Sequence, residues 1–273
     1  MQFSKQEIVK YIKQRHQNDG GFHFANIEPS GGSDTFCAVS VLSMLGETIN
    51  DKEKIKKFFD SLMQDDEIND VIGMYFTVHT LYQLGYKKSL LNKYIDMEEI
   101  IRSYTITSRK DIFVESVSSL RNAYYATCIT KLLEIKSENK KILEFVRSCK
   151  NDDGGYESRD YSSIPDTFFA LSTLSNIDEL NNEAITKKYL LSLSDSILKS
   201  YLEYVYWHFE SLLLLGNNPA YIEAIPNYLA RCFRTNGGFC RSPFQGISTF
   251  EDTFYAVSIL TRLERLLNKK LVV

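Results

Sequence analysis

Two adjacent acidic residues, Glu251 and Asp252, lie where the last helix of the chain is predicted to begin. A carboxylic acid that its neighbour keeps protonated can donate a proton to a substrate, so this pair is a candidate for acid-initiated chemistry. Asp166 and Asp34 occupy the corresponding place in two earlier segments, and a threonine follows each of these aspartates. Because Asp is a favoured N-cap residue, helix capping is the simpler explanation for all three aspartates.

Aromatic residues follow these acidic positions. Their faces can line a cavity for an apolar chain and can stabilise a carbocation, although any single aromatic residue more often packs in a core. The aromatic positions predicted to form such a wall are Phe36, Tyr75, Phe76, Tyr124, Tyr125, Phe168, Phe169, Tyr206, Trp207, Phe254 and Tyr255.

Basic residues near the same helix starts are candidates for binding a diphosphate, which arginine can hold through two hydrogen bonds at once. Arg159 lies seven residues before Asp166, and Arg241 follows a glycine pair. Arg121 directly precedes Asn122, where another aromatic-rich helix is predicted to begin. Each alone is more often a solvated loop charge. Two of them close together would favour a diphosphate site.

A repeated segment positions these residues. A glycine pair and an aromatic residue lead through a loop to Asp-Thr-Phe, three times along the chain: 20–22 to 34–36, 154–156 to 166–168, and 237–239 to 252–254. Recurrence of this kind indicates an array of one structural unit.

The chain alternates between helices with one polar face and helices that are apolar all round, which predicts outer and buried inner helices. The predicted outer helices are 4–17, 52–64, 96–104, 138–150, 183–193 and 219–233. The inner helices are predicted to start at Asp34, Gly73, Asn122, Asp166, Tyr204 and Asp252. An open array needs polar caps, yet the first and last inner helices are as apolar as the others. We therefore predict one all-α domain over residues 1–273, a twelve-helix α/α toroid.

Composition narrows the choice of function. The net charge of −3 argues against nucleic acid as a partner, and no segment approaches the ~18 apolar residues of a membrane span. The first 16 residues are predicted to form an amphipathic helix and not a secretory signal. The five cysteines include no C-x-x-C pair, which argues against a disulfide framework, and a cytoplasmic protein is expected.

The glycine pair followed by D-T-F-x-A-[VL]-S resembles the repeat of protein prenyltransferase β subunits and of squalene and oxidosqualene cyclases. The resemblance covers essentially the whole chain, strongly in three repeats. It implies an α/α toroid with an aromatic central cavity for isoprenoid chains. If the inner helices run in one direction, their N-termini meet at one rim, where partial positive charge suits the diphosphate of such a substrate. A transferase β subunit would also imply a helical partner subunit.

This sequence departs from the zinc site of the protein prenyltransferases. The resemblance places its aspartate at Asp166, but Phe168 stands where the family has cysteine, and Trp207 and Tyr255 stand where a histidine is expected. A rearranged set of Asp34, Cys37 and His23 is the alternative. We predict no ligand set, and leave zinc or magnesium open as a cofactor.

Two histidines, His79 and His208, lie on predicted inner helices and are expected to be core residues with satisfied hydrogen bonds.

Two functional classes follow. One is an enzyme acting on an isoprenoid diphosphate, by transfer or by cyclisation. Cyclases that protonate their substrate resemble this chain near Glu251 with D-x-D-D-T, but here the segment is T-F-E-D-T, which lacks the first acid. The alternative is a toroid without catalysis that binds an isoprenoid, a lipid or another hydrophobic small molecule, or a partner protein.

Overall fold

The computed structural model describes residues 3–103, 119–136, 138–157, 161–181, 183–268 and 270–272. Its inner helices are α2 (Gly32–Met44), α4 (Val71–Gln83), α7 (Ser119–Leu133), α9 (Ile164–Asn176), α11 (Leu202–Leu214) and α13 (Phe250–Leu266). The outer helices are α1 (Lys5–Lys13), α3 (Lys52–Gln64), α6 (Met97–Arg102), α8 (Asn139–Ser148), α10 (Ala184–Leu193) and α12 (Ile225–Cys232).

Short elements complete the described chain. They are α5 (Lys88–Leu91), the 3₁₀ turns η1 (Asn92–Tyr94), η3 (Ile197–Lys199) and η4 (Ile222–Ala224), and the strands β1 (Phe239–Cys240) and β2 (Ser248–Thr249). The two strands pair antiparallel, with Phe239 opposite Thr249 and Cys240 opposite Ser248.

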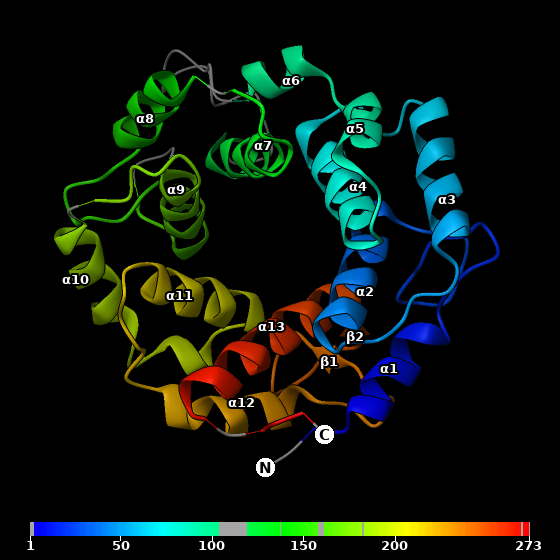
Figure 1. The fold of residues 1–273 in the computed structure, drawn as a ribbon. Helices are drawn as coiled ribbons and strands as arrows, with labels where there is room; N and C mark the ends of the chain where they lie inside the picture. Colours follow the sequence, from blue (N-terminus) through cyan, green and yellow to red (C-terminus); the bar gives the residue numbers. More distant parts are fainter. Residues whose placement is uncertain are drawn as a thin grey trace.

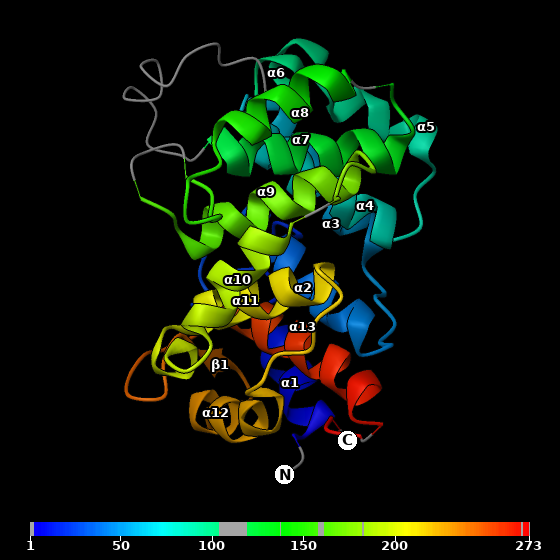
Figure 2. The same cartoon turned by 90° about the vertical axis from the view of Figure 1, so that its left-hand side faces the viewer.

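The inner helices form a closed ring. Each packs on the next in the order α2, α4, α7, α9, α11, α13, and α13 packs on α2. Figure 1 shows this ring with the outer helices around it, and Figure 2 shows it from the side. The prediction of an all-α toroid is confirmed, and an open solenoid is excluded.

Burial explains the two kinds of helix. In α2 every residue from Thr35 to Leu42 is buried, because neighbouring helices cover it on all sides. In α8 the buried residues are Ile142, Phe145 and Val146, the i, i+3, i+4 stripe of a helix with one covered face.

Contacts between the two ends of the chain hold the ring shut. The Tyr11 hydroxyl donates a hydrogen bond to the Ser248 carbonyl over 2.9 Å, and the Phe3 amide donates to the Leu271 carbonyl over 2.6 Å. Gly237 has φ +91°, and a Cβ atom there would collide with the Glu7 backbone carbonyl. The last glycine turn therefore packs directly against the first helix.

The threonine of each Asp-Thr pair joins its glycine turn to its inner helix. The Thr253 hydroxyl accepts a hydrogen bond from the Phe239 amide at 3.1 Å and donates to the Thr249 carbonyl at 2.6 Å. Thr167 makes the same two bonds to Tyr156 and Ser163, and Thr35 makes them to Phe22 and Gly31. This repeated polar junction explains why the motif recurs.

The prediction that the aspartates cap the helices is wrong. The inner helices begin earlier than predicted, so Asp34, Asp166 and Asp252 lie inside the first turn. The capping oxygens belong to Ser163 and Thr249, which accept hydrogen bonds from the Asp166 and Asp252 amides. Serine and threonine fit this role because their short hydroxyls reach the amide three residues ahead.

None of the helices in the described ranges is both long enough and apolar enough to cross a membrane.

Candidate functional site

A cavity of about 680 Å³ lies inside the ring, at the N-terminal end of the inner helices. Five of the six helices present positions i, i+3 and i+4 to it, as Arg121, Tyr124 and Tyr125 do from α7, and α4 presents Tyr75 and Phe76. Such positions share one helix face, so the six helices line the cavity with equivalent stripes.

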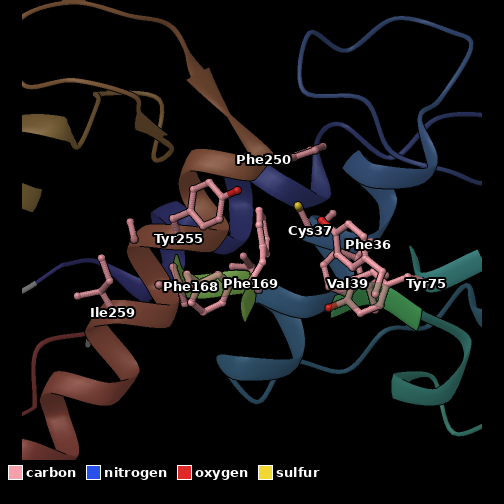
Figure 3. Close-up of a cluster of buried hydrophobic side chains, with 14 of the residues drawn as sticks. Phe36, Cys37, Val39, Tyr75, Phe168, Phe169, Phe250, Tyr255 and Ile259 are labelled. Atoms are coloured by element: carbon pink, nitrogen blue, oxygen red, sulfur yellow. The ribbon is translucent and has the colours of Figure 1, made fainter. Parts of the chain in front are cut away.

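Six aromatic side chains form a closed layer around this cavity, one from each inner helix. Adjacent ring centroids are 5.3 to 6.3 Å apart, which is the range of favourable aromatic contacts. Figure 3 shows part of the wall, with Phe36 and Tyr75 to one side and Phe168 and Tyr255 to the other. In order around the ring, the layer consists of Phe36, Tyr75, Tyr124, Phe168, Tyr206 and Phe254.

The next position along each helix extends the wall. Tyr125, Phe169, Trp207 and Tyr255 are linked in sequence by centroid distances of 6.5, 5.9 and 6.0 Å. Phe76 and Cys37 take the equivalent places on α4 and α2. The structure therefore brings every aromatic residue of the predicted wall to the cavity.

The mouth of the cavity carries more acidic than basic side chains. Among the described residues that line it, Asp34, Asp166, Glu203 and Glu251 are acidic, and Arg121 is basic. The inner-helix N-termini do meet there, but their carboxylates offset the partial positive charge of the helices. The expectation of an electropositive rim is wrong for the described part of the chain.

Arg121 and Glu251 are fixed by tyrosines of the wall. The Tyr255 hydroxyl donates a hydrogen bond to Glu251 Oε1 over 2.7 Å. Arg121 Nε donates to the Tyr125 hydroxyl over 3.4 Å, and its guanidinium lies 5.5 Å from the centre of that ring. Burial raises the pKa of both tyrosines, so each hydroxyl stays protonated at neutral pH.

Asp252 does not line the cavity, although its neighbour Glu251 does. Its carboxylate accepts a hydrogen bond from the Thr249 hydroxyl at 2.7 Å, and the residue is 5% exposed. Burial raises the pKa of Asp252 to about 6, with a further contribution from the charge of Glu251. Within the Glu251–Asp252 pair, the carboxyl group whose pKa is raised is thus not the one that lines the cavity.

Arg241 lies beside the mouth, where it is paired with one of the mouth acids. Arg241 forms an ion pair of 2.6 Å with Glu203 and lies over the Tyr201 ring, with 4.1 Å to its centre. Arg159 lies outside the described residues. A convergent arginine pair is therefore not seen in the described part of the structure.

The residues present do not fit the zinc site of the prenyltransferases. Phe168 and Tyr255 line the cavity where that site needs cysteine and histidine, and neither ring supplies a zinc ligand. Within the described ranges, no group of three His, Cys, Asp or Glu side chains could hold a metal ion. This holds also for the alternative set of Asp34, Cys37 and His23, which the described structure does not bring together as such a group.

The two inner-helix histidines differ. His208 is buried, and its ring nitrogens lie 2.6 Å from the Tyr221 hydroxyl and 2.8 Å from the Leu190 carbonyl, as expected of a core histidine. His79 Nε2 is buried and has no hydrogen-bond partner within the described residues. The Cys128 backbone acts on His79 as a hydrogen-bond partner that raises its pKa against the larger effect of burial, so the expectation of a satisfied core histidine is met only in part.

Glu203 is the mouth residue that sequence analysis missed. The inner helix was predicted to start at Tyr204, which left Glu203 outside it, whereas α11 begins at Leu202. Glu203 stands in the same register as Arg121 and Glu251, one position before the start of the repeat motif. Comparing that column across the repeats would have found it.

Comparison with known proteins supports this architecture. Residues 1–65, 105–197 and 186–272 match the family model described as the prenyltransferase alpha-alpha toroid domain. Among solved structures, the chain is similar to Candida albicans protein geranylgeranyltransferase-I complexed with GGPP, with a TM-score of 0.74 and 14% identity, over 97% of this chain and 92% of that one. No curated protein matches the sequence. The chain belongs to the prenyltransferase alpha-alpha toroid family.

Proposed function

We propose that this protein binds an isoprenoid chain in its central cavity, with the head group of the ligand at the mouth. The continuous aromatic wall of an open cavity carries this proposal. Branched, unsaturated chains pack well against aromatic faces, and burying them removes apolar surface from water. The similar Candida albicans structure holds GGPP, which is consistent with this ligand class.

The acidic mouth favours a neutral head group over a diphosphate. Asp34, Asp166 and Glu251 would repel a diphosphate, while Arg121 is the basic lining residue in the described ranges. Glu203 also lines the mouth, but Arg241 offsets its charge. A divalent cation bound to the diphosphate would reduce this repulsion. We therefore propose that a prenyl alcohol binds at least as tightly as its diphosphate when Mg²⁺ is absent, and that Mg²⁺ narrows the difference.

Binding is better supported than catalysis. Transfer to a thiol by the family's zinc chemistry lacks its ligands here. Acid-initiated cyclisation needs a protonated acid aimed into the cavity, whereas Asp252 does not line the cavity and Glu251 is exposed. Asp34 lines the cavity and burial raises its pKa, but its carboxylate accepts a hydrogen bond from the Phe24 amide, which favours the charged form. All five cysteines are free thiols, which fits the cytoplasmic location that we propose.

The fluorescence of Trp207 tests the proposal, because this is the single tryptophan of the chain and it lines the cavity. Titration with geraniol, farnesol or geranylgeraniol should change its emission with saturation at one ligand per chain. Trp207→Phe removes this fluorescence and is the control for the origin of the signal. Binding to that variant is then measured by calorimetry. If none of the three alcohols binds by either method, the proposal is wrong.

A second candidate, docking of a partner protein, is favoured by apolar side chains in the loops that lead into α2, α9 and α13. Tyr161, Phe244, Ile247 and Ile27 are 83, 79, 70 and 57% exposed. The loop with Phe244 and Ile247 joins β1 to β2 and projects from the mouth side of the ring (Figure 2). Exposed apolar groups of this kind often mark a binding surface.

The double change Phe244→Ser with Ile247→Ser tests this candidate. We expect a partner chain to co-purify with the unchanged protein in equal amount, and to be lost from the double variant. Leu90→Ser, which changes an exposed leucine of α5, is the control and should keep the partner. Equal retention by both variants would contradict docking at the mouth loops.

A further inference from the structure

The charges around the mouth of the cavity are not evenly balanced. On one side of the ring, Asp34 lines the mouth from α2 and Glu251 lines it from α13, which packs on α2. On the other side, basic Arg121 of α7 and acidic Asp166 of α9 lie on neighbouring helices. Glu203 forms an ion pair with a nearby arginine. The excess of negative charge therefore lies on the side of α2 and α13.

The two carboxylates on that side receive hydrogen bonds from neutral donors. The Tyr255 hydroxyl donates to Glu251 over 2.7 Å, and the Phe24 amide donates to Asp34 over 3.0 Å. Within the described ranges neither carboxylate forms an ion pair, and Arg121 donates a hydrogen bond to a tyrosine of its own helix. The negative charges of Asp34 and Glu251 are therefore not offset by a cation in the described part of the chain.

Asp34 and Glu251 also influence each other. Burial raises the pKa of Asp34, the Phe24 amide and His23 act against this effect, and the charge of Glu251 adds to it. Like charges that lie near each other are unfavourable, and a cation placed between them stabilises both. This side of the mouth can therefore accept a positive charge.

The aromatic wall on the same two helices can bind a cation as well. Phe36 follows Asp34 on α2, and Phe254 follows Glu251 on α13, each within one helical turn. Both rings line the cavity, and their centroids are 5.7 Å apart. Aromatic faces attract ammonium groups, and rings arranged around an opening are a known way of binding alkylammonium ligands. Carboxylates and aromatic rings thus favour the same kind of head group.

An organic cation fits this side of the mouth better than a metal ion. Zinc and magnesium need several ligands in a defined geometry. No group of three His, Cys, Asp or Glu side chains in the described ranges could supply them. An ammonium group needs only hydrogen-bond acceptors and aromatic faces, which this part of the cavity offers.

We propose that the mouth binds a protonated amine between Asp34 and Glu251, while the isoprenoid chain attached to the amine occupies the aromatic cavity. The inference rests on the proposed binding function and specifies its ligand as a prenyl amine. The ammonium group donates hydrogen bonds to the two carboxylates, and the first carbon atoms of the chain contact Phe36 and Phe254. The resulting order of affinity is amine, then alcohol, then diphosphate.

Geranylamine and geraniol are the matched probes, because they carry the same chain and differ in the head group. A primary alkylamine is protonated at pH 7, as the lysine side chain is. Calorimetry with the full chain at low salt should give about a 10-fold higher affinity for geranylamine. This preference should shrink when the salt concentration rises from about 0.05 M to about 0.5 M, because salt screens the charges at the open mouth.

Two substitutions locate the ammonium. Asp34→Asn and Glu251→Gln each remove one negative charge and keep an oxygen that can accept the existing hydrogen bond. Each should reduce the ratio of the geranylamine affinity to the geraniol affinity by about 3- to 5-fold. Glu179→Gln is the control, since this residue follows the C-terminal end of α9 and does not line the cavity, and it should leave the ratio unchanged.

The outcomes separate this inference from the proposed function. If geraniol binds and geranylamine binds no more tightly, the ammonium site is wrong and the binding function stands. The site is also wrong if Asp34→Asn and Glu251→Gln leave the ratio unchanged, or if Glu179→Gln reduces it as much as they do. If neither ligand binds, both proposals fail.

Discussion

The first turns of α2, α9 and α13, the three inner helices with the Asp-Thr motif, carry two kinds of position that differ in how much they vary. Thr35, Thr167 and Thr253 are identical and make the same hydrogen bonds to their glycine turns. The cavity-facing position two residues earlier varies in the same three repeats, with Ser33, Pro165 and Glu251. The repeated positions therefore specify the ring, and the positions where the repeats diverge form the candidate site.

The largest effect is expected where a repeated position closes the ring. Gly237→Ala should lower the free energy of unfolding by about 4 kcal/mol or more, because its Cβ would collide with the Glu7 backbone and φ +91° is strained for alanine. Gly216→Ala is the matched control, since φ is +66° but nothing lies within 4 Å of the new Cβ, and it should cost about 1 kcal/mol. Urea unfolding measures both. Equal losses would show that the junction does not hold the ring.

The buried carboxyl of Asp252 is expected to make the stability of the protein depend on pH. Its pKa of about 6 lies above the ordinary value of 3.8, so the folded state binds a proton more tightly than the unfolded state. Its contribution to stability is therefore present below about pH 4 and is lost as the pH rises through about 6. Asp252→Asn should be more stable than the unchanged protein at pH 7.5, by up to about 3 kcal/mol, and the gap should close towards pH 4. Urea unfolding at several pH values provides the measurement, and a gap independent of pH would contradict the burial argument.

The junction threonine offers a smaller, isosteric change. Thr253→Val leaves the buried Phe239 amide without its acceptor and should cost about 1 to 3 kcal/mol in thermal or urea unfolding. Thr261→Val removes one hydrogen bond, to the Val257 carbonyl within the same helix, and should cost less than about 0.5 kcal/mol. If Thr253→Val lowers the free energy of unfolding no more than Thr261→Val does, the repeated junction has no special role in stability.

The smallest effect is expected at a divergent mouth position, and on binding rather than on stability. Glu251→Gln keeps an acceptor for the Tyr255 hydroxyl but removes a negative charge from the mouth. Affinity for geranyl diphosphate should rise by about 3- to 10-fold while affinity for geraniol stays the same, because a charge near the mouth acts on the charged ligand alone. Glu179→Gln, which does not line the cavity, serves as the control. An equal change for both ligands would indicate a packing effect.

The ring was predictable from the sequence because its signals are local and repeated. Apolar helices alternate with one-faced helices, and the Asp-Thr motif marks where three inner helices begin. The wall followed from the same register, so Tyr124 and Phe168 lie where they were expected. The exact helix starts were missed, because Ser163 and Thr249 supply the caps in place of the more conspicuous aspartates.

The charge of the mouth and the hydrogen bonding of His79 were not predictable in the same way. Glu203 faces the cavity only because α11 starts two residues earlier than the pattern indicated. The unpartnered Nε2 of His79 depends on which groups neighbouring helices bring to it, and periodicity within one helix carries no information about that. Properties of single repeats were therefore readable, and properties created between repeats required the structure.

A crystal structure of the protein with bound geraniol would test the central claim most directly. We predict one ligand chain inside the ring, in contact with Trp207 and with the six-residue layer that runs from Phe36 to Phe254. A cavity collapsed on its own side chains, or a ligand found only on the outer surface, would contradict the account.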